Sequence, residues 1–359
     1  MSSSHNSPDE PSTADDHSEA DSPLLSVRDL TTTFATADGA RRAVDGVSFT
    51  VDAGETVCLV GESGSGKTVA TESITQLIDQ PPGTIRGDLR FNGTDLLALS
   101  QPELRSIRGA EIAHIFQNPQ ESMNPCYTVG WQLVEAIQVH EEVPEPQARR
   151  RAVGLLNRVG IDSASSRFTD YPHEFSGGQK QRVMIAMALV GSPQLLLADE
   201  PTTALDVTVQ AQILDVLAEL QAETGMGILF VTHDLGVVAE IADRVVVMYA
   251  GKVMERGSVD DVFHRPAHPY TRALLACLPA YGGTNGGIPG SLPDPTDPPD
   301  GCRFADRCEH AVSACRTGDQ PQAIALSDGH HVSCVHYQSG YDPQTVREDG
   351  TIRQEETDD

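Results

Sequence analysis

Residues 61–68 read Gly61-Glu62-Ser63-Gly64-Ser65-Gly66-Lys67-Thr68. The apolar run 57–60 before this loop predicts a buried strand, and the spacing of apolar residues over 70–78 predicts a helix after it. In that context the backbone N–H groups of the loop close around phosphate oxygens, Lys67 reaches the outer phosphates and Thr68 ligates magnesium. We therefore predict a nucleoside-triphosphate site. The alternative is a chance glycine turn between a core strand and a core helix.

Composition limits the class of protein. The 359 residues, 39% of them hydrophobic, suffice for about two domains. The net charge of −27 excludes a simple electrostatic attraction to nucleic acid or anionic lipid. Acids outnumber bases by 52 to 25, and lysine is nearly absent, which predicts a surface adapted to high salt and a halophilic source. The sequence has neither a long apolar run nor a signal-like start, so we expect a cytoplasmic chain.

Sequence patterns also predict how the chain is divided. Residues 1–22 are acidic, rich in serine and proline, and without lysine or arginine, which predicts a disordered leader. The alternation over 85–91 ends in an Asn-Gly pair, a hairpin signal, so we expect antiparallel strands beside the main sheet. From 129 to 159 the apolar period is helical, which predicts an inserted helical subdomain over about 118–175.

Polar residues follow three predicted strands. Asp199 and Glu200 end one of them: Asp199 would hold magnesium through water, and Glu200 would orient or deprotonate the attacking water. The alternative is a solvated pair of acids. Gln117 projects from the end of a second strand. His233 follows a third and could stabilise the terminal phosphate, with a structural role as the alternative.

Two further features could contact a nucleotide. The run 176–179, Ser-Gly-Gly-Gln, opens a predicted helix with Ser176 as its N-cap, which makes a second potential anion site. A plain capped helix with a flexible entry explains it equally well. Phe34 lies between two predicted strands, where its ring could stack on adenine or simply pack against the core.

Taken together and in this order, these motifs resemble those of the ATP-binding-cassette (ABC) ATPases over residues 24–275. The Ser-Gly-Gly-Gln motif separates this family from kinases, GTPases and recombinase-like enzymes. Phe175 stands where leucine is commoner, a conservative departure. The resemblance implies an α/β fold for residues 23–281: a P-loop ABC ATPase with a RecA-like core sheet, an antiparallel β subdomain and a helical subdomain.

The resemblance also implies roles for single residues. Glu200, His233 and Lys67 would be catalytic, and Thr68, Gln117 and Asp199 would hold magnesium. ATP would be contacted by Phe34, Gly61, Glu62, Ser63, Gly64, Ser65, Gly66, Lys67, Thr68, Gln117, Ser176, Gly177, Gly178, Gln179 and Asp206. In such ATPases two cassettes close head to tail, so the 176–179 motif of one chain contacts the ATP of the other, and Asp206 lies at the interface.

Four segments narrow the resemblance. Residues 116–125, 184–188, 198–212 and 268–275 are similar to the ATPases of dipeptide and oligopeptide importers. This implies a second, non-identical ABC ATPase, two transmembrane permease subunits and an extracellular substrate-binding protein as partners. It places the chain on the cytoplasmic face of the membrane, with no nucleic-acid partner.

Three other functions compete with peptide import. The same ATPase could serve nickel, a sugar or another small solute, since the cargo is chosen by other subunits. A soluble ABC ATPase in DNA repair or translation would need paired cassettes, a coiled-coil insertion or a basic surface, and the sequence has none of these. A cysteine-based redox sensor with a vestigial ATPase conflicts with intact catalytic motifs.

The cysteines gather near the C-terminus. Glycines and prolines define a linker over 282–301, a cysteine-rich module follows over 302–340, and a disordered acidic tail is expected over 341–359. Four cysteines could bind one metal centre: Cys302, Cys308, Cys315 and Cys334. Disulfides are disfavoured in cytoplasm, whereas zinc is an alternative because His310, His330, His331 and His336 lie nearby. Similar segments of peptide-importer ATPases carry a 4Fe-4S cluster, which we favour.

Overall fold

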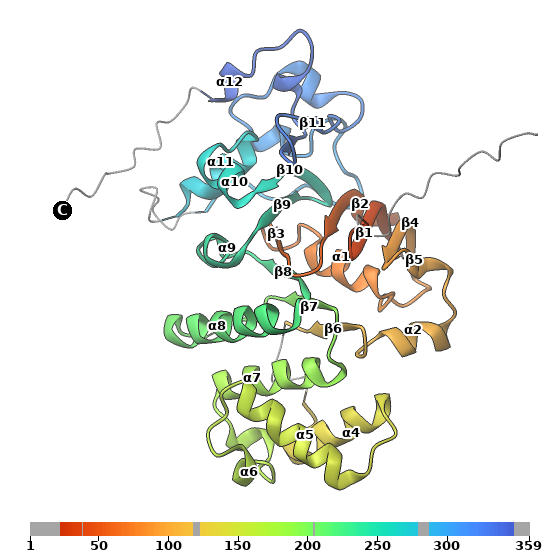
Figure 1. Cartoon of the computed structure of the whole chain (residues 1–359). Coiled ribbons are helices and arrows are strands. Elements are labelled where there is room, and N and C mark those ends of the chain that lie inside the picture. Colours follow the sequence, from red (N-terminus) through yellow and green to blue (C-terminus); the bar gives the residue numbers. More distant parts are fainter. Residues whose placement is uncertain (1–21, 38, 118–122, 204, 279–286, 348–359) are drawn as a thin grey trace, which may run out of the picture.

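The computed structural model describes residues 22–37, 39–117, 123–203, 205–278 and 287–347. Almost all of the predicted leader and residues 348–359 of the predicted tail lie outside these ranges. Figure 1 shows the described chain as a central region of strands, with one group of helices at one end and the C-terminal segment at the other.

The strands are β1 (Leu25–Thr36), β2 (Gly39–Val51), β3 (Thr56–Val60), β4 (Gly83–Phe91), β5 (Thr94–Asp95), β6 (Ile112–Ile115), β7 (Leu195–Asp199), β8 (Gly227–Thr232), β9 (Arg244–Tyr249), β10 (Lys252–Ser258), β11 (Ile324–Ala325) and β12 (His331–Val332). The helices are α1 (Lys67–Ile74), α2 (Gln101–Ile107), α4 (Val129–His140), α5 (Glu145–Arg158), α6 (Ala164–Arg167), α7 (Gly177–Ala188), α8 (Val207–Thr224), α9 (Leu235–Ile241), α10 (Val259–His264), α11 (Pro269–Ala276) and α12 (Gln344–Arg347).

The larger sheet carries the loop after β3. Within the described residues it has eight strands, in the order β11-β12-β10-β9-β3-β8-β7-β6. Strands β9, β3, β8, β7 and β6 are parallel, and β3 and β8 are buried along their whole length. A parallel strand with helices on both faces reads as a continuous apolar run, which is why the run 57–60 predicted it.

The smaller sheet confirms the antiparallel prediction. In the described part of the chain it contains β2, β1, β4 and β5 in that order, and the Asn-Gly pair joins β4 to β5. The helical period over 129–159 is confirmed as well, since α4 and α5 pack against each other and lie with α6 at one end of the molecule (Figure 1).

The C-terminal segment joins the larger sheet. Strand β12 pairs with β10 through Glu255 and Arg256, and β11 pairs with β12. Residues 287–301 contain neither helix nor strand, and their role as a linker stays a prediction. The predicted disorder from residue 341 is wrong for 341–347, because α12 forms there and buries Val346. An apolar valine among polar residues gives too weak a signal to predict that contact.

Candidate active site

The loop between β3 and α1 is shaped by glycines that no other residue could replace. Gly66 has φ 101°, and a Cβ there would lie 2.3 Å from the Ala43 carbonyl oxygen. Gly61 has φ 152°, and a Cβ there would lie 2.1 Å from the Met248 carbonyl oxygen. Neighbouring backbone therefore presses against the loop on two sides, which leaves its N–H groups to face a ligand.

Lys67 lies under the loop. Its Nζ donates to the carbonyl oxygen of Gly61 at 2.7 Å and to that of Glu62 at 3.0 Å. Burial lowers the pKa of Lys67, whereas the carboxylates of Glu200, Asp199 and Glu62 act to raise it. A buried ammonium group bound only to neutral oxygens is ready to pair with an incoming phosphate.

Asp199 ends β7 next to Thr68, whose hydroxyl donates to it. Burial raises the pKa of Asp199, and the nearby Glu200 charge raises it further. Its Oδ1 is buried and has no hydrogen-bond partner among the described residues. A buried, unsatisfied carboxylate oxygen beside a threonine hydroxyl fits a hydrated magnesium ion.

Glu200 is the most tightly held side chain of the site. His233 Nδ1 lies 2.9 Å from its Oε1, and Gln117 Nε2 donates to its Oε2 at 2.9 Å. The Thr203 hydroxyl donates to the same Oε2 at 2.9 Å. Burial acts to raise the pKa of Glu200, but these hydrogen bonds outweigh it and lower the pKa below its ordinary value. Glu200 is thus an ionised, oriented carboxylate at neutral pH.

Seven of the predicted residues line one cavity of about 560 Å³. They are Ser63, Gly64, Gly66, Lys67, Thr68, Gln117 and, beside them, Glu200. The sequence did not predict several other lining residues, among them Leu292 and Arg303 from the C-terminal segment. Thr203 was missed too; its position three residues after Glu200 was the available signal.

The 176–179 motif is not part of this cavity's lining. Ser176 caps α7, its Oγ accepting from Gln179 N at 3.3 Å, while Gln179 Oε1 accepts from Ser176 N at 3.1 Å. Asp206 likewise caps α8 through Val209 N at 3.0 Å. In the described chain these residues are helix caps on an exposed surface, and their contact with ATP stays a prediction.

Phe34 lies on β1, where its half-buried ring packs against the core of the smaller sheet. A Cβ added to Gly83 would lie 3.6 Å from the Phe34 ring, and Phe34 is absent from the lining of the cavity. The packing alternative is therefore what the structure contains, and adenine stacking stays a prediction.

The four C-terminal cysteines form no disulfide in the described structure, and three of them are buried. Backbone N–H groups of Phe304, His310 and His336 point at the thiols two residues earlier, those of Cys302, Cys308 and Cys334. Burial raises the pKa of these three thiols to about 12, 11 and 12 respectively, and neighbouring cysteines raise it further. The cysteines are thus close to one another. Nevertheless, no group of three or more His, Cys, Asp or Glu side chains in the described ranges could hold a metal ion, so the structure does not show the predicted four-cysteine metal module.

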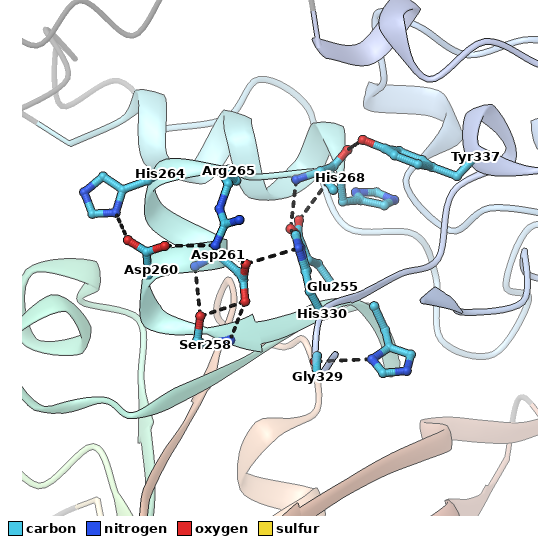
Figure 2. Close-up of polar contacts among 12 residues, drawn as sticks. Glu255, Ser258, Asp260, Asp261, His264, Arg265, His268, Gly329, His330 and Tyr337 are labelled. Carbon is cyan, nitrogen blue, oxygen red and sulfur yellow. Dashed lines mark hydrogen bonds and ion pairs between the residues drawn. The ribbon is translucent and has the colours of Figure 1, made fainter. Parts of the chain in front are cut away.

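His330, one possible zinc ligand, is engaged elsewhere. Figure 2 shows it against β10, where its Nε2 lies 2.8 Å from Glu255 Oε1 and its Nδ1 lies 3.6 Å from Asp261 Oδ1. Glu255 also accepts the N–H groups of Ala267 and His268, each at 2.8 Å. This buried network ties the C-terminal segment to the larger sheet and argues against His330 as a ligand.

Comparison with known proteins defines the family. The ABC transporter family model matches residues 44–203, and the model of the oligopeptide/dipeptide transporter C-terminal region matches residues 254–315. The oligopeptide transport ATP-binding protein OppD of Bacillus subtilis (strain 168) is 49% identical over 314 residues, which cover 86% of this chain and 87% of that protein. The dipeptide transport ATP-binding protein DppD of Escherichia coli (strain K12) is 49% identical over 317 residues, covering 88% and 96%.

A solved structure supports the fold. A dimeric ATP-binding cassette in a post-hydrolysis state, bound to ADP and Pi, has a TM-score of 0.60 at 27% identity, covering 66% of this chain and 99% of that one. Fold and site together define an ABC-type ATPase. The chain belongs to the oligopeptide and dipeptide transporter family of ABC ATP-binding subunits. No helix among the described residues is both long and apolar enough to cross a membrane.

Proposed function

We propose that ATP hydrolysis by this chain powers the import of dipeptides or oligopeptides. The observation that carries this proposal is the match of residues 254–315 to the C-terminal region of oligopeptide/dipeptide transporters, because the ATPase core by itself is common to transporters of many solutes. The site supports ATP hydrolysis, since Glu200 is ionised and held in place by hydrogen bonds beside the phosphate loop.

The residues divide the chemistry among themselves. Lys67 and the loop N–H groups would bind the phosphates, and Thr68 and Asp199 would hold magnesium, which neutralises phosphate charge when bound. Glu200 would orient or deprotonate the attacking water. His233 hydrogen-bonds the Glu200 carboxylate and would contact the terminal phosphate, so that it would couple the phosphate to Glu200.

Partners complete the site and provide the pathway. The exposed 176–179 motif supports a closed pair of cassettes, in which it would reach the ATP of a second, non-identical ATPase. Two permease subunits and an extracellular substrate-binding protein would accompany them, with this chain peripheral on the cytoplasmic face. Purification from native membranes should recover these subunits; recovery of only nucleic acid or ribosomes would overturn the proposal.

Uptake by the reconstituted transporter tests the cargo. Vesicles containing the complex should accumulate labelled di- and oligopeptides when ATP is supplied on the side of this chain. The matched control carries Glu200→Gln in place of the wild-type chain and should bind ATP without uptake. Accumulation of nickel or a sugar, with no peptide uptake, would contradict the proposed cargo but not the ATPase function.

We further propose that Cys302, Cys308, Cys315 and Cys334 bind a 4Fe-4S cluster, with zinc as the alternative. Backbone N–H groups aimed at three of the sulfurs support it, because such hydrogen bonds stabilise thiolates. Anaerobic purification and metal analysis should give iron and sulfide; stoichiometric zinc without iron would overturn it. The role would be structural or regulatory.

The acid-rich composition supports a halophilic protein. With a net charge of −27, mutual repulsion of surface carboxylates should destabilise the fold in dilute buffer. Thermal unfolding and ATPase activity should both improve in molar potassium chloride. Full stability and activity in dilute buffer would contradict this proposal.

A further inference from the structure

A guanidinium from the C-terminal segment reaches into the phosphate loop. Arg307, which directly precedes Cys308, lies 3.1 Å through its Nη1 from Glu62 Oε2. Its side chain is only 5% exposed. The two residues are 245 positions apart in the sequence, so this ion pair brings a distant segment to the second residue of the loop.

The other contacts of Arg307 fix its position independently of Glu62. Nε donates to the Pro289 carbonyl oxygen at 2.8 Å, and Nη2 donates to that of Ile288 at 2.8 Å. Nη1 also donates to Tyr249 Oη at 3.1 Å. With these partners a loss of Glu62 would leave Arg307 in place, whereas a loss of Arg307 would leave Glu62 unpaired.

Glu62 depends on this partner. Its N–H donates to Tyr270 Oη at 3.0 Å, and its carbonyl oxygen accepts from Lys67 Nζ at 3.0 Å, so its backbone is part of the phosphate loop's own network. Its side chain has Arg307 as the cation on Oε2, while Oε1 is buried without a hydrogen-bond partner in the described chain. The next two residues, Ser63 and Gly64, line the cavity, so a charge on Glu62 repels a bound triphosphate unless a cation compensates it.

The linker lies alongside the same loop. Leu292 and Pro295 line the cavity, and the Pro295 carbonyl oxygen accepts from Arg42 N at 3.0 Å. A Cβ on Gly64 would lie 3.4 Å from Leu292 Cδ1. Arg303, next to Cys302, also lines the cavity and pairs with Asp45 at 2.6 Å. The C-terminal segment therefore contacts the nucleotide site at several points, and Arg307 makes an ion pair with the loop itself.

We propose that Arg307 is a positioning residue of the ATP site: it neutralises and holds Glu62, so that the C-terminal cysteine segment sets the affinity of the phosphate loop for ATP. This inference rests on the ATPase function and on neither the peptide cargo nor the identity of a metal.

The test is a double-mutant cycle in the full-length chain. Arg307→Ala should weaken binding of a non-hydrolysable ATP analogue with magnesium roughly tenfold, because the charge of Glu62, which directly precedes the phosphate-binding residues, is then uncompensated. Glu62→Gln should bind the analogue about twofold more tightly than wild type, because a negative charge is removed from the loop while Arg307 stays. The double variant should return to within about threefold of wild type, since the repelling charge is gone. In steady-state ATPase assays KM should rise in Arg307→Ala with kcat nearly unchanged.

Two controls separate positioning from folding. Arg316→Ala removes an exposed arginine of the same segment, paired with Asp306, and should leave affinity unchanged. If Arg307→Ala does not fold, Arg307→Gln, which keeps a donor at the same place without charge, should show the same loss and the same rescue. Wild-type affinity in a folded Arg307 variant, or an unrescued double variant, would overturn the inference. Failure of the wild-type chain to bind ATP would instead overturn the ATPase function.

Discussion

At the phosphate loop, Gln117, Glu200 and the first residues of α1 line one cavity, whereas at the start of α7 the Ser176 and Gln179 side chains hydrogen-bond each other's backbone N–H groups. The first region contains Asp199 Oδ1, a buried oxygen without a hydrogen-bond partner. Among the described side chains of residues 176–179 no buried polar atom lacks a partner. The difference teaches that the phosphate-loop cavity has ligand-binding groups of its own, whereas the described 176–179 motif is occupied by its own helix cap; its contact with the ATP of a second chain stays a prediction.

The largest expected effect falls on the first region. Glu200→Gln keeps the shape of the side chain but removes the oriented charge, so hydrolysis should fall by about 10²- to 10⁴-fold while ATP binding persists. Rapid-quench phosphate release and equilibrium binding measure the two. Asp215→Asn, an exposed acid on α8, is the matched control. Wild-type turnover in Glu200→Gln would end the catalytic assignment.

A smaller loss is expected from the second region. Ser176→Ala should lower hydrolysis by the assembled transporter about 10²-fold, as loss of a phosphate hydrogen bond does, yet leave ATP affinity of the isolated chain unchanged. It should also cost about 1 kcal/mol of unfolding free energy through the lost cap. Ser258→Ala removes a similar cap on α10, with Asp261 N at 3.1 Å, and should show the stability loss alone. Weaker ATP binding by isolated Ser176→Ala would break the contrast between the regions.

The substitution Asp199→Asn should have opposite effects on magnesium affinity and on the stability of the fold. The magnesium concentration for half-maximal activity should rise about tenfold, because a charged ligand becomes neutral. The stability of the fold without magnesium should increase, although magnesium binding weakens. Burial raises the folded pKa of Asp199 above its ordinary value, so the ionised carboxylate costs stability as pH rises through that range, and the asparagine variant should melt at a higher temperature at pH 7. A lower melting temperature without magnesium would contradict this reading.

The smallest expected effect concerns pH. Hydrogen bonds, one of them from Gln117, lower the folded pKa of Glu200, so its carboxylate stays ionised to lower pH than an ordinary glutamate. Gln117→Ala should raise that pKa and move the acid limb of the kcat profile to higher pH by less than about one unit. Thr203→Val should act in the same direction, since Thr203 donates to the same oxygen. An unchanged limb in both variants would show that another group controls it.

Sequence order explains how the residues of the first region come together, while their roles stay predictions. The loop, Glu200 and His233 follow buried strands, and Asp199 ends one of them. Parallel strands bring their carboxyl ends to one edge, so sequence order alone brings these residues together. Arg303 and Arg307 could not be predicted in the same way, because they reach the site from over 200 residues away through a segment without periodicity. Strands β11 and β12 are two residues long, too short to show an alternating pattern.

The pairing of β12 with β10 has a consequence for solubility. Without the C-terminal segment, β10 would be the outermost strand of the larger sheet, and its unpaired N–H and C=O groups would offer a template to another chain. The short strands β12 and β11 cover that border and then end, which limits further growth. A protein truncated before residue 287 should therefore self-associate through β10, even where its nucleotide chemistry survives.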